Sequence, residues 1–116
     1  MNRTLIWLDD MRDPFIGDWV KRYSPIGTFD VNVVWVKSFK EFKIYIAANG
    51  LPDAICFDHD LGDGPTGYDA AKYVVDFCLD FQVPAPLFNV QSSNPTGKES
   101  IITLINNYSK FFNENK

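Results

Sequence analysis

Two aspartate pairs are the residues of this sequence best suited to chemistry. Asp9 and Asp10 directly follow the apolar run 4–8, and Asp58 and Asp60 directly follow a second apolar run. Carboxylates that converge repel one another unless protons or a cation offset their charge. Oxygen ligands of this kind suit Mg²⁺, so Asp9 or Asp10 could bind it together with Asp58 and a backbone carbonyl near Asp60. The alternative is that these aspartates only cap helices or end strands.

One histidine and two polar loops accompany the aspartates. His59 is the only histidine of the chain, and it is a candidate general acid, metal ligand or phosphate contact. The alternative is that it only hydrogen-bonds a loop. Residues 61–67 could offer backbone amides to an anion, although turn chemistry alone explains their glycines. Residues 92–98 offer hydroxyls, an amide and Lys98 to a phosphate.

The elements that must position these residues alternate along the chain. Helices are predicted at 39–49, from 66–68 to about 79, and at about 97–112. Ser38 and Glu41 form a capping box at the start of the first of these helices. A fourth helix from Asp13-Pro14 to Tyr23 is less clear. Short apolar segments, which predict a parallel sheet buried on both faces, occupy 4–8, 29–36, 54–57 and 87–90.

This alternation predicts an α/β fold over residues 1–116, as a single domain. We expect a three-layer, doubly wound parallel sheet of about four strands in the order 2-1-3-4. In such sheets ligands bind at the carboxyl ends of the strands, where the winding direction reverses. That point falls between the first and third strands, which are the two that end in aspartates.

Composition limits the partners. The net charge is -4, and no basic run is longer than Lys21-Arg22. An extended nucleic-acid surface is therefore disfavoured, whereas a small phosphorylated ligand or an RNA end remains open. No segment has the length of a membrane span or the pattern of a signal peptide. Cys56 and Cys78 lie in apolar periodic segments, so we expect buried thiols in a cytoplasmic protein.

Four motifs spread over the chain carry a family resemblance: LDDMRDP at 8–14, FDHDLG at 57–62, GYDAA at 67–71 and SSNPTG at 92–97. Together they resemble the cyclic-phosphate processing receiver domain family, an offshoot of response-regulator receivers that is frequent in bacteria and their phages. The resemblance implies a flavodoxin-like receiver fold with an acidic pocket for a divalent cation, Mg²⁺ or Mn²⁺. It also implies a role in processing cyclic phosphates of nucleotides or RNA ends.

By this resemblance, Asp9 and Asp10 match the acidic pair that follows the first strand of receivers. Asp58 matches their phospho-acceptor position, and Asp60 would lend a backbone carbonyl to the metal. Gly67 falls where receivers keep a glycine.

The resemblance also covers the fourth strand and its loop, with one departure. Ser92 stands for the hydroxyl residue of receivers. Lys98 is the nearest candidate for their lysine, because no fifth strand is predicted. Gln91 stands where the family usually has histidine, which leaves His59 as the only side chain of this kind. Glutamine donates a hydrogen bond but does not shuttle a proton, so reduced, altered or absent activity is implied.

Three functions remain open at this stage. We rank first a metal-dependent hydrolase of a cyclic phosphate or phosphodiester, and second a receiver-like phosphoryl acceptor. The third is a non-enzymatic module that binds a nucleotide or a partner protein, such as a phage factor that sequesters a host signal. For the hydrolase, the predicted catalytic residues are Asp58, His59 and Asp10, the metal ligands Asp9, Asp10, Asp58 and Asp60, and the phosphate contacts Arg12, Ser92, Ser93, Asn94 and Lys98.

Overall fold

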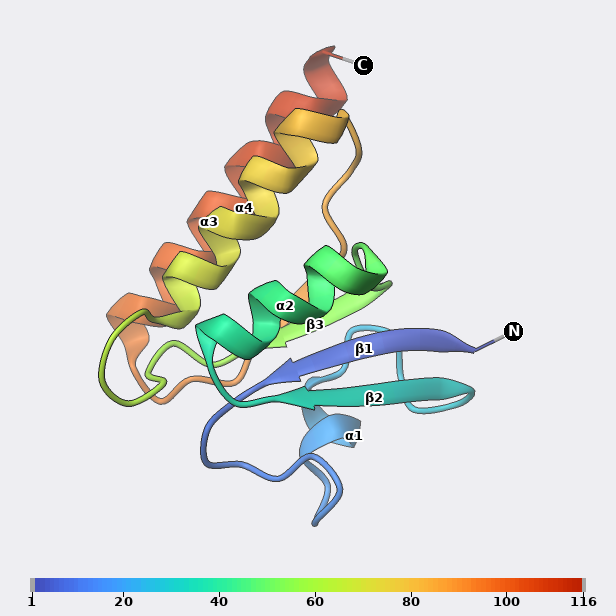
Figure 1. Ribbon diagram of the computed structural model, residues 1–116, viewed down its shortest axis with the longest axis vertical. Coiled ribbons are helices and arrows are strands. Elements are labelled where there is room, and N and C mark those ends of the chain that lie inside the picture. The colour runs from blue at the N-terminus through green and yellow to red at the C-terminus, as the bar shows by residue number, and fades with distance from the viewer. Residues whose placement is uncertain (1, 116) are drawn as a thin grey trace.

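A four-stranded parallel sheet organises the molecule. The computed structural model describes residues 2–115 and arranges their strands in the order β2-β1-β3-β4 (Figure 1). This order and the doubly wound fold are as predicted. The strands are β1 (Arg3–Leu8), β2 (Val31–Val36), β3 (Ala54–Phe57) and β4 (Leu87–Val90).

Helices cover both faces of the sheet unequally. α2, α3 and α4 lie on one side, where α3 and α4 run side by side beyond the strands, and the short α1 lies on the other side (Figure 1). Within residues 2–115, no helix has the length and hydrophobicity that crossing a membrane requires. The helices are α1 (Trp19–Tyr23), α2 (Phe39–Asn49), α3 (Gly67–Phe81) and α4 (Pro95–Asn115).

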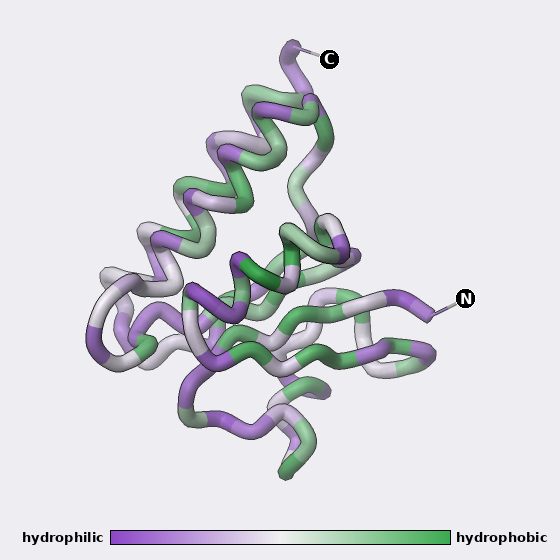
Figure 2. Tube along the Cα trace, in the orientation of Figure 1, coloured by the Kyte–Doolittle hydropathy of each residue, from purple (hydrophilic) through white to green (hydrophobic). Residues whose placement is uncertain are grey.

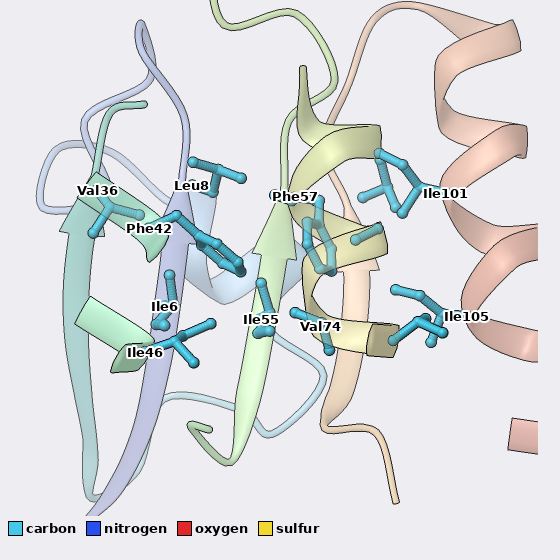
Figure 3. Close-up of a cluster of buried hydrophobic side chains, with 14 of the residues drawn as sticks. Ile6, Leu8, Val36, Phe42, Ile46, Ile55, Phe57, Val74, Ile101 and Ile105 are labelled. Atoms are coloured by element: carbon cyan, nitrogen blue, oxygen red, sulfur yellow. The ribbon is translucent and has the colours of Figure 1, made fainter. Parts of the chain in front are cut away.

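The larger core lies between the sheet and α2, α3 and α4. Ile6 and Leu8 of β1 point to this side, where they meet Phe42 and Ile46 of α2 (Figure 3). All four side chains are at most 1% exposed. Figure 2 shows the change from the hydrophobic strand β1 to the hydrophilic segment that follows it. The strand is therefore anchored by burial up to the point at which its polar residues begin.

A second core lies on the opposite face of the sheet. Because side chains alternate along a strand, Leu5 and Trp7 of β1 point there, and Val20 of α1 packs against them. Cys56 of β3 joins this second core. Burial on both faces explains why the central strands β1 and β3 are almost continuously apolar.

Both cysteines are buried free thiols, as predicted. Burial raises the pKa of the Cys56 thiol to about 12 and that of Cys78 to about 11. Both groups therefore stay protonated at neutral pH, and a protonated thiol is a poor nucleophile and metal ligand.

The segment before α1 departs from the prediction. A helix from Asp13 was expected, but the helix begins only at Trp19. The Asp13 carboxylate accepts the N–H of Phe15 at 2.8 Å, and Gly17 has a φ of 70°. These local turns replace the first two helical turns, because a side-chain acceptor competes with the helical bonding pattern.

Smaller differences occur at element ends. The second strand was expected from Phe29 but begins at Val31, since Phe29 is 88% exposed and Asp30 has a φ of 56°. α4 is longer at both ends than the predicted 97–112. Leu79, expected on the buried stripe of α3, is 47% exposed. By contrast, the bounds of α2, β3 and β4 are those predicted, and Ser38 caps α2 by accepting the Glu41 N–H at 3.1 Å.

Candidate functional site

The residues that follow β1, β3 and β4 form a row along the carboxyl edge of the sheet. The last residues of these strands are in register, so Asp9, Asp58 and Gln91, which follow them, lie side by side. Backbone hydrogen bonds continue the ladder into this row. The Asp58 N–H donates to the Leu8 carbonyl at 2.9 Å, and the Gln91 N–H donates to the Phe57 carbonyl at 3.0 Å. α3 and α4 begin at the same edge of the molecule (Figure 1).

Asp9 anchors the loop that follows β1. One carboxylate oxygen accepts the backbone N–H groups of Met11 and Arg12, both at 2.9 Å. The other accepts the Arg12 guanidinium at 3.1 Å and the Gln91 amide at 3.4 Å. Asp9 is fully buried, so its charge is neutralised by N–H donors of this chain rather than by water.

Two tryptophans that the sequence analysis did not single out fix the same loop. Trp35 donates its indole N–H to the Asp9 carbonyl at 2.8 Å, and Trp7 donates to the Arg12 carbonyl at 2.9 Å. A tryptophan near the polar end of a buried strand needs an acceptor for its N–H. That requirement is the signal in the sequence that could have pointed to these supports.

Three carboxylates converge at this edge. Asp9, Asp10 and Asp58 each contribute an oxygen, and the three oxygens lie within 4.8 Å of one another. We call these residues the acidic cluster. The Arg12 guanidinium lies 3.1 Å from Asp9 and 3.8 Å from Asp58. Asp10 Oδ1 is buried without a hydrogen-bond partner among the described residues. One cation thus faces three acids, which leaves negative charge for a ligand to offset.

This arrangement disfavours the charged form of Asp58. Asp58 is 5% exposed. Burial, and then the charge of Asp9, raise the pKa of Asp58 from 3.8 to about 7, although Arg12 opposes the rise. The acidic cluster is therefore easily protonated or neutralised by a cation at physiological pH.

His59 lies between the starts of α3 and α4, and its ring is held in one orientation. Its Nδ1 is 2.9 Å from Asp60 Oδ1, and the Asn94 amide nitrogen is 3.5 Å from the same Nδ1. The hydrogen bond with His59 is the main reason that the pKa of Asp60 is lowered. With Nδ1 facing a carboxylate, the proton sits on Nδ1, and Nε2 has no partner among residues 2–115.

Two glycines allow this placement. A Cβ at Gly97 of α4 would overlap His59 Cγ and lie 2.6 Å from Nδ1, so the imidazole packs against bare backbone. A Cβ at Gly67 would overlap the Asp58 carbonyl oxygen, and the Gly67 N–H donates to the His59 carbonyl at 2.8 Å. Gly67 was matched to a receiver glycine by resemblance, whereas Gly97 had no predicted role beyond its motif.

The Gln91 side chain is buried and hydrogen-bonds the ends of neighbouring strands. It is 2% exposed, and its amide nitrogen is 3.1 Å from the Leu8 carbonyl and 3.5 Å from the Cys56 carbonyl. Its Oε1 has no hydrogen-bond partner in the described part of the chain. The side chain thus links the ends of neighbouring strands and does not face solvent.

The remaining predicted phosphate contacts border the site without joining the acidic cluster. Asn94 caps α4 by accepting the Gly97 N–H at 3.0 Å, and Ser92 accepts the Asn94 N–H at 3.1 Å. Ser93 is exposed. Lys98, on the first turn of α4, makes no ion pair with the acidic cluster within residues 2–115. The Asp60 side chain is 62% exposed and faces His59 rather than the three carboxylates.

Comparisons with known proteins agree with this architecture. The family model of the cyclic-phosphate processing receiver domain matches residues 4–107. A fusion protein with the trimeric coiled coil of yeast Spc42 has a similar fold, with a TM-score of 0.60 at 16% identity, over 99% of this chain and 83% of that chain. Among curated proteins, none matches the chain.

Two further solved structures are response regulators. The receiver domain of PhyR from Erythrobacter litoralis has a TM-score of 0.48 at 18% identity, over 95% of this chain and 92% of that chain. The PhyR stress response regulator has a TM-score of 0.49 at 16% identity, over 100% of this chain and 48% of that chain. The family match spans most of the chain and includes every residue of the site, so the chain belongs to the cyclic-phosphate processing receiver domain family.

Proposed function

We propose that this domain hydrolyses a cyclic phosphate or phosphodiester on a nucleotide or an RNA end, with Mg²⁺ or Mn²⁺ bound at the acidic cluster. The observation that carries the proposal is the oriented His59, whose Nδ1 is tied to Asp60 and whose Nε2 is free, directly beside Asp58 in the chain. Family membership supports the choice of a phosphate substrate.

The acidic cluster fits a hard divalent cation. Its donors are all carboxylate oxygens, which Mg²⁺ and Mn²⁺ prefer. Asp10 has an oxygen without a partner, and the burial of Asp58 makes an added positive charge favourable there. Asp9 already accepts several N–H donors, so Asp10 and Asp58 would be the main ligands, and Asp60 stays a predicted carbonyl ligand. When bound, such a cation polarises a phosphoryl oxygen and promotes ionisation of a water.

The side chains of this protein would share the remaining tasks. Protonated His59 would donate a proton from Nε2 to the leaving oxygen, while the Asp60 carboxylate holds the ring and stabilises its positive charge. The Arg12 side chain is 24% exposed and would contact a phosphate oxygen without leaving Asp9. We propose Ser92, Ser93, Asn94 and Lys98, which follow β4 or lie in the first turn of α4, as further phosphate contacts.

The glutamine in place of a family histidine does not remove an exposed proton donor from this chain. Gln91 is 2% exposed and hydrogen-bonds backbone carbonyls. Gln91 thus supports the strand ends at a position that is almost closed to solvent. This supports the hydrolase over a module without chemistry.

A second function is favoured by the position of Asp58. It follows β3 at the level of Asp9, which is where receivers carry the phosphoryl acceptor, and a phosphoryl group could be transferred to it. An aspartyl phosphate would need a cation at the acidic cluster, as the hydrolase does. The two functions differ in their requirement for His59.

The test is a product assay on the purified domain. A panel of 2′,3′-cyclic nucleotides, 3′,5′-cyclic nucleotides and an RNA with a cyclic phosphate end would be incubated with Mg²⁺, with Mn²⁺ or with chelator. We expect metal-dependent release of monophosphate that falls about a hundredfold or more in His59→Ala and Asp58→Asn. Asp63→Asn, an exposed change of the same charge, is the matched control.

The alternatives give different outcomes in the same experiment. A labile phosphoryl adduct that is lost in Asp58→Asn but kept in His59→Ala would identify the acceptor. Absence of product from every substrate, while the cation still protects the domain against heating, would refute the hydrolase.

A further inference from the structure

A groove beside His59 has no role in the site described so far. It is an open groove between the start of α3 and the outer face of α4, with a volume of about 820 Å³. This volume is within the range of roughly 300–1,000 Å³ typical of small-molecule sites. Its lining includes His59, Thr66, Tyr68, Thr96, Ser100 and Thr103.

The chemistry of the groove suits a neutral, planar and polar group. Among the described residues, its lining contains no Lys or Arg, and Glu99 is its one carboxylate. The hydroxyls of Thr96 and Thr103 and the amide of Asn107 are left without hydrogen-bond partners among residues 2–115. The ring of Tyr68 likewise has no ring–ring contact with another described aromatic side chain. Unpaired hydroxyls and an aromatic ring in the groove wall can contact a sugar and a base.

His59 links this groove to the acidic cluster along the chain. The preceding residue, Asp58, belongs to the acidic cluster, whereas the His59 side chain is part of the groove wall. A general acid must lie next to the leaving oxygen to which it gives a proton. The organic group that carries the leaving oxygen must therefore extend from His59 into the groove.

We propose that the groove binds the single nucleoside whose 2′ or 3′ oxygen leaves when the phosphate ester is opened. This inference rests on the proposed function and names its substrate class: a nucleoside 2′,3′-cyclic phosphate, free or at the end of an RNA. The base stacks on Tyr68, and Glu99 with the free hydroxyls receives the sugar. A chain of further phosphates does not enter, because the lining offers no lysine or arginine to neutralise it.

The test measures binding separately from turnover. Isothermal titration calorimetry with Mg²⁺ would compare adenosine 3′-monophosphate with inorganic phosphate on the wild type. Thr103→Trp fills the groove from an exposed position of α4, and Asn113→Trp places the same ring outside the lining as the matched control. Far-ultraviolet circular dichroism verifies that both variants are folded.

We expect the wild type to bind the nucleotide at least about tenfold more tightly than phosphate, because the aromatic contact adds to the phosphate contacts. Thr103→Trp should abolish this difference, Asn113→Trp should keep it, and phosphate affinity should be equal in all three. Equal affinity for nucleotide and phosphate in the wild type, or an unchanged difference in Thr103→Trp, would overturn the inference.

The same variants separate this inference from the proposed function. If cyclic nucleotides are hydrolysed with a KM that Thr103→Trp leaves unchanged, the groove proposal is wrong and the hydrolase stands. If the binding pattern appears as expected but no cyclic substrate yields product, the hydrolase is wrong and the nucleoside site stands.

Discussion

Replacing Asp58 by asparagine should stabilise the metal-free protein at neutral and higher pH. Asp58 is 5% exposed beside two other carboxylates, and burial raises its pKa from 3.8 to about 7. In the unfolded chain the group ionises freely, whereas in the folded chain the ionised form is disfavoured. Asparagine has nearly the same shape and carries no charge, so Asp58→Asn removes this cost.

The magnitude follows from the two pKa values. A rise from 3.8 to about 7 corresponds to an upper limit of ~4 kcal/mol in unfolding free energy once Asp58 is ionised. Local relaxation and water entry reduce this limit, so we expect a gain of about 2 kcal/mol at pH 8, or roughly 8 °C in Tm.

The pH dependence has a definite sign. Between about pH 4 and pH 7 the folded state holds the Asp58 proton more tightly than the unfolded state does. The contribution of Asp58 to the unfolding free energy is therefore fully present below pH 4 and is lost as the pH rises through about 7. Asp58→Asn should lack this loss.

The assay is urea and thermal unfolding with chelator at several pH values between 4 and 8.5. Asp63→Asn, which removes a charge from an exposed position of the loop after β3, is the control and should change little. Adding Mg²⁺ should stabilise the wild type and not Asp58→Asn, since a ligand that binds only the folded state raises its stability. The reasoning is refuted if Asp58→Asn is no more stable than the control at pH 8.

Other features of the structure give three further predictions. Gly97→Ala would force the His59 ring to move, so hydrolysis should fall about tenfold or more while circular dichroism shows an intact fold. Trp35→Phe would remove the N–H bond to the Asp9 carbonyl and lower the unfolding free energy in urea by about 1–2 kcal/mol. Ser38→Ala would remove the cap of α2 and cost about 1 kcal/mol in the same measurement.

Each of these has an outcome that contradicts it. Full activity in Gly97→Ala would show that the His59 orientation is not needed. Equal stability of wild type and Trp35→Phe would show that water replaces the lost bond. For Ser38→Ala, an unchanged urea midpoint would mean that the first turn of α2 is held by packing alone.

The sheet and the convergence of the aspartates were predictable because they depend on local patterns. Short apolar segments separated by helical periodicity specify a parallel sheet, and its handedness limits the strand order. Once β1 and β3 are neighbours, residues that follow their last apolar positions meet. This argument predicts that Asp9 and Asp58 lie together, and their oxygens are within 4.8 Å of one another and of an Asp10 oxygen.

The supports of the site were not predictable in the same way. Trp35 reaches Asp9 across 26 positions of the chain, and the packing of His59 on Gly97 joins two loops that no periodicity relates. The loop before α1 was missed because Asp13 can begin a helix or form a turn, and the choice depends on its packing. Contacts between distant segments decide these details, and a single sequence carries no local signal for them.

Asp9 and Asp58 show why geometry is needed to assign roles to equivalent residues. Both follow an apolar strand, both are buried, and they lie side by side. Asp9, however, accepts two backbone N–H groups and the Arg12 guanidinium, so its charge is already neutralised within the protein. The charge of Asp58 is opposed by Arg12 at 3.8 Å and by the backbone N–H of His59, and burial makes that charge costly. Of the two, Asp58 is therefore the carboxylate that would gain more from an added cation, whereas Asp9 anchors the loop that follows β1.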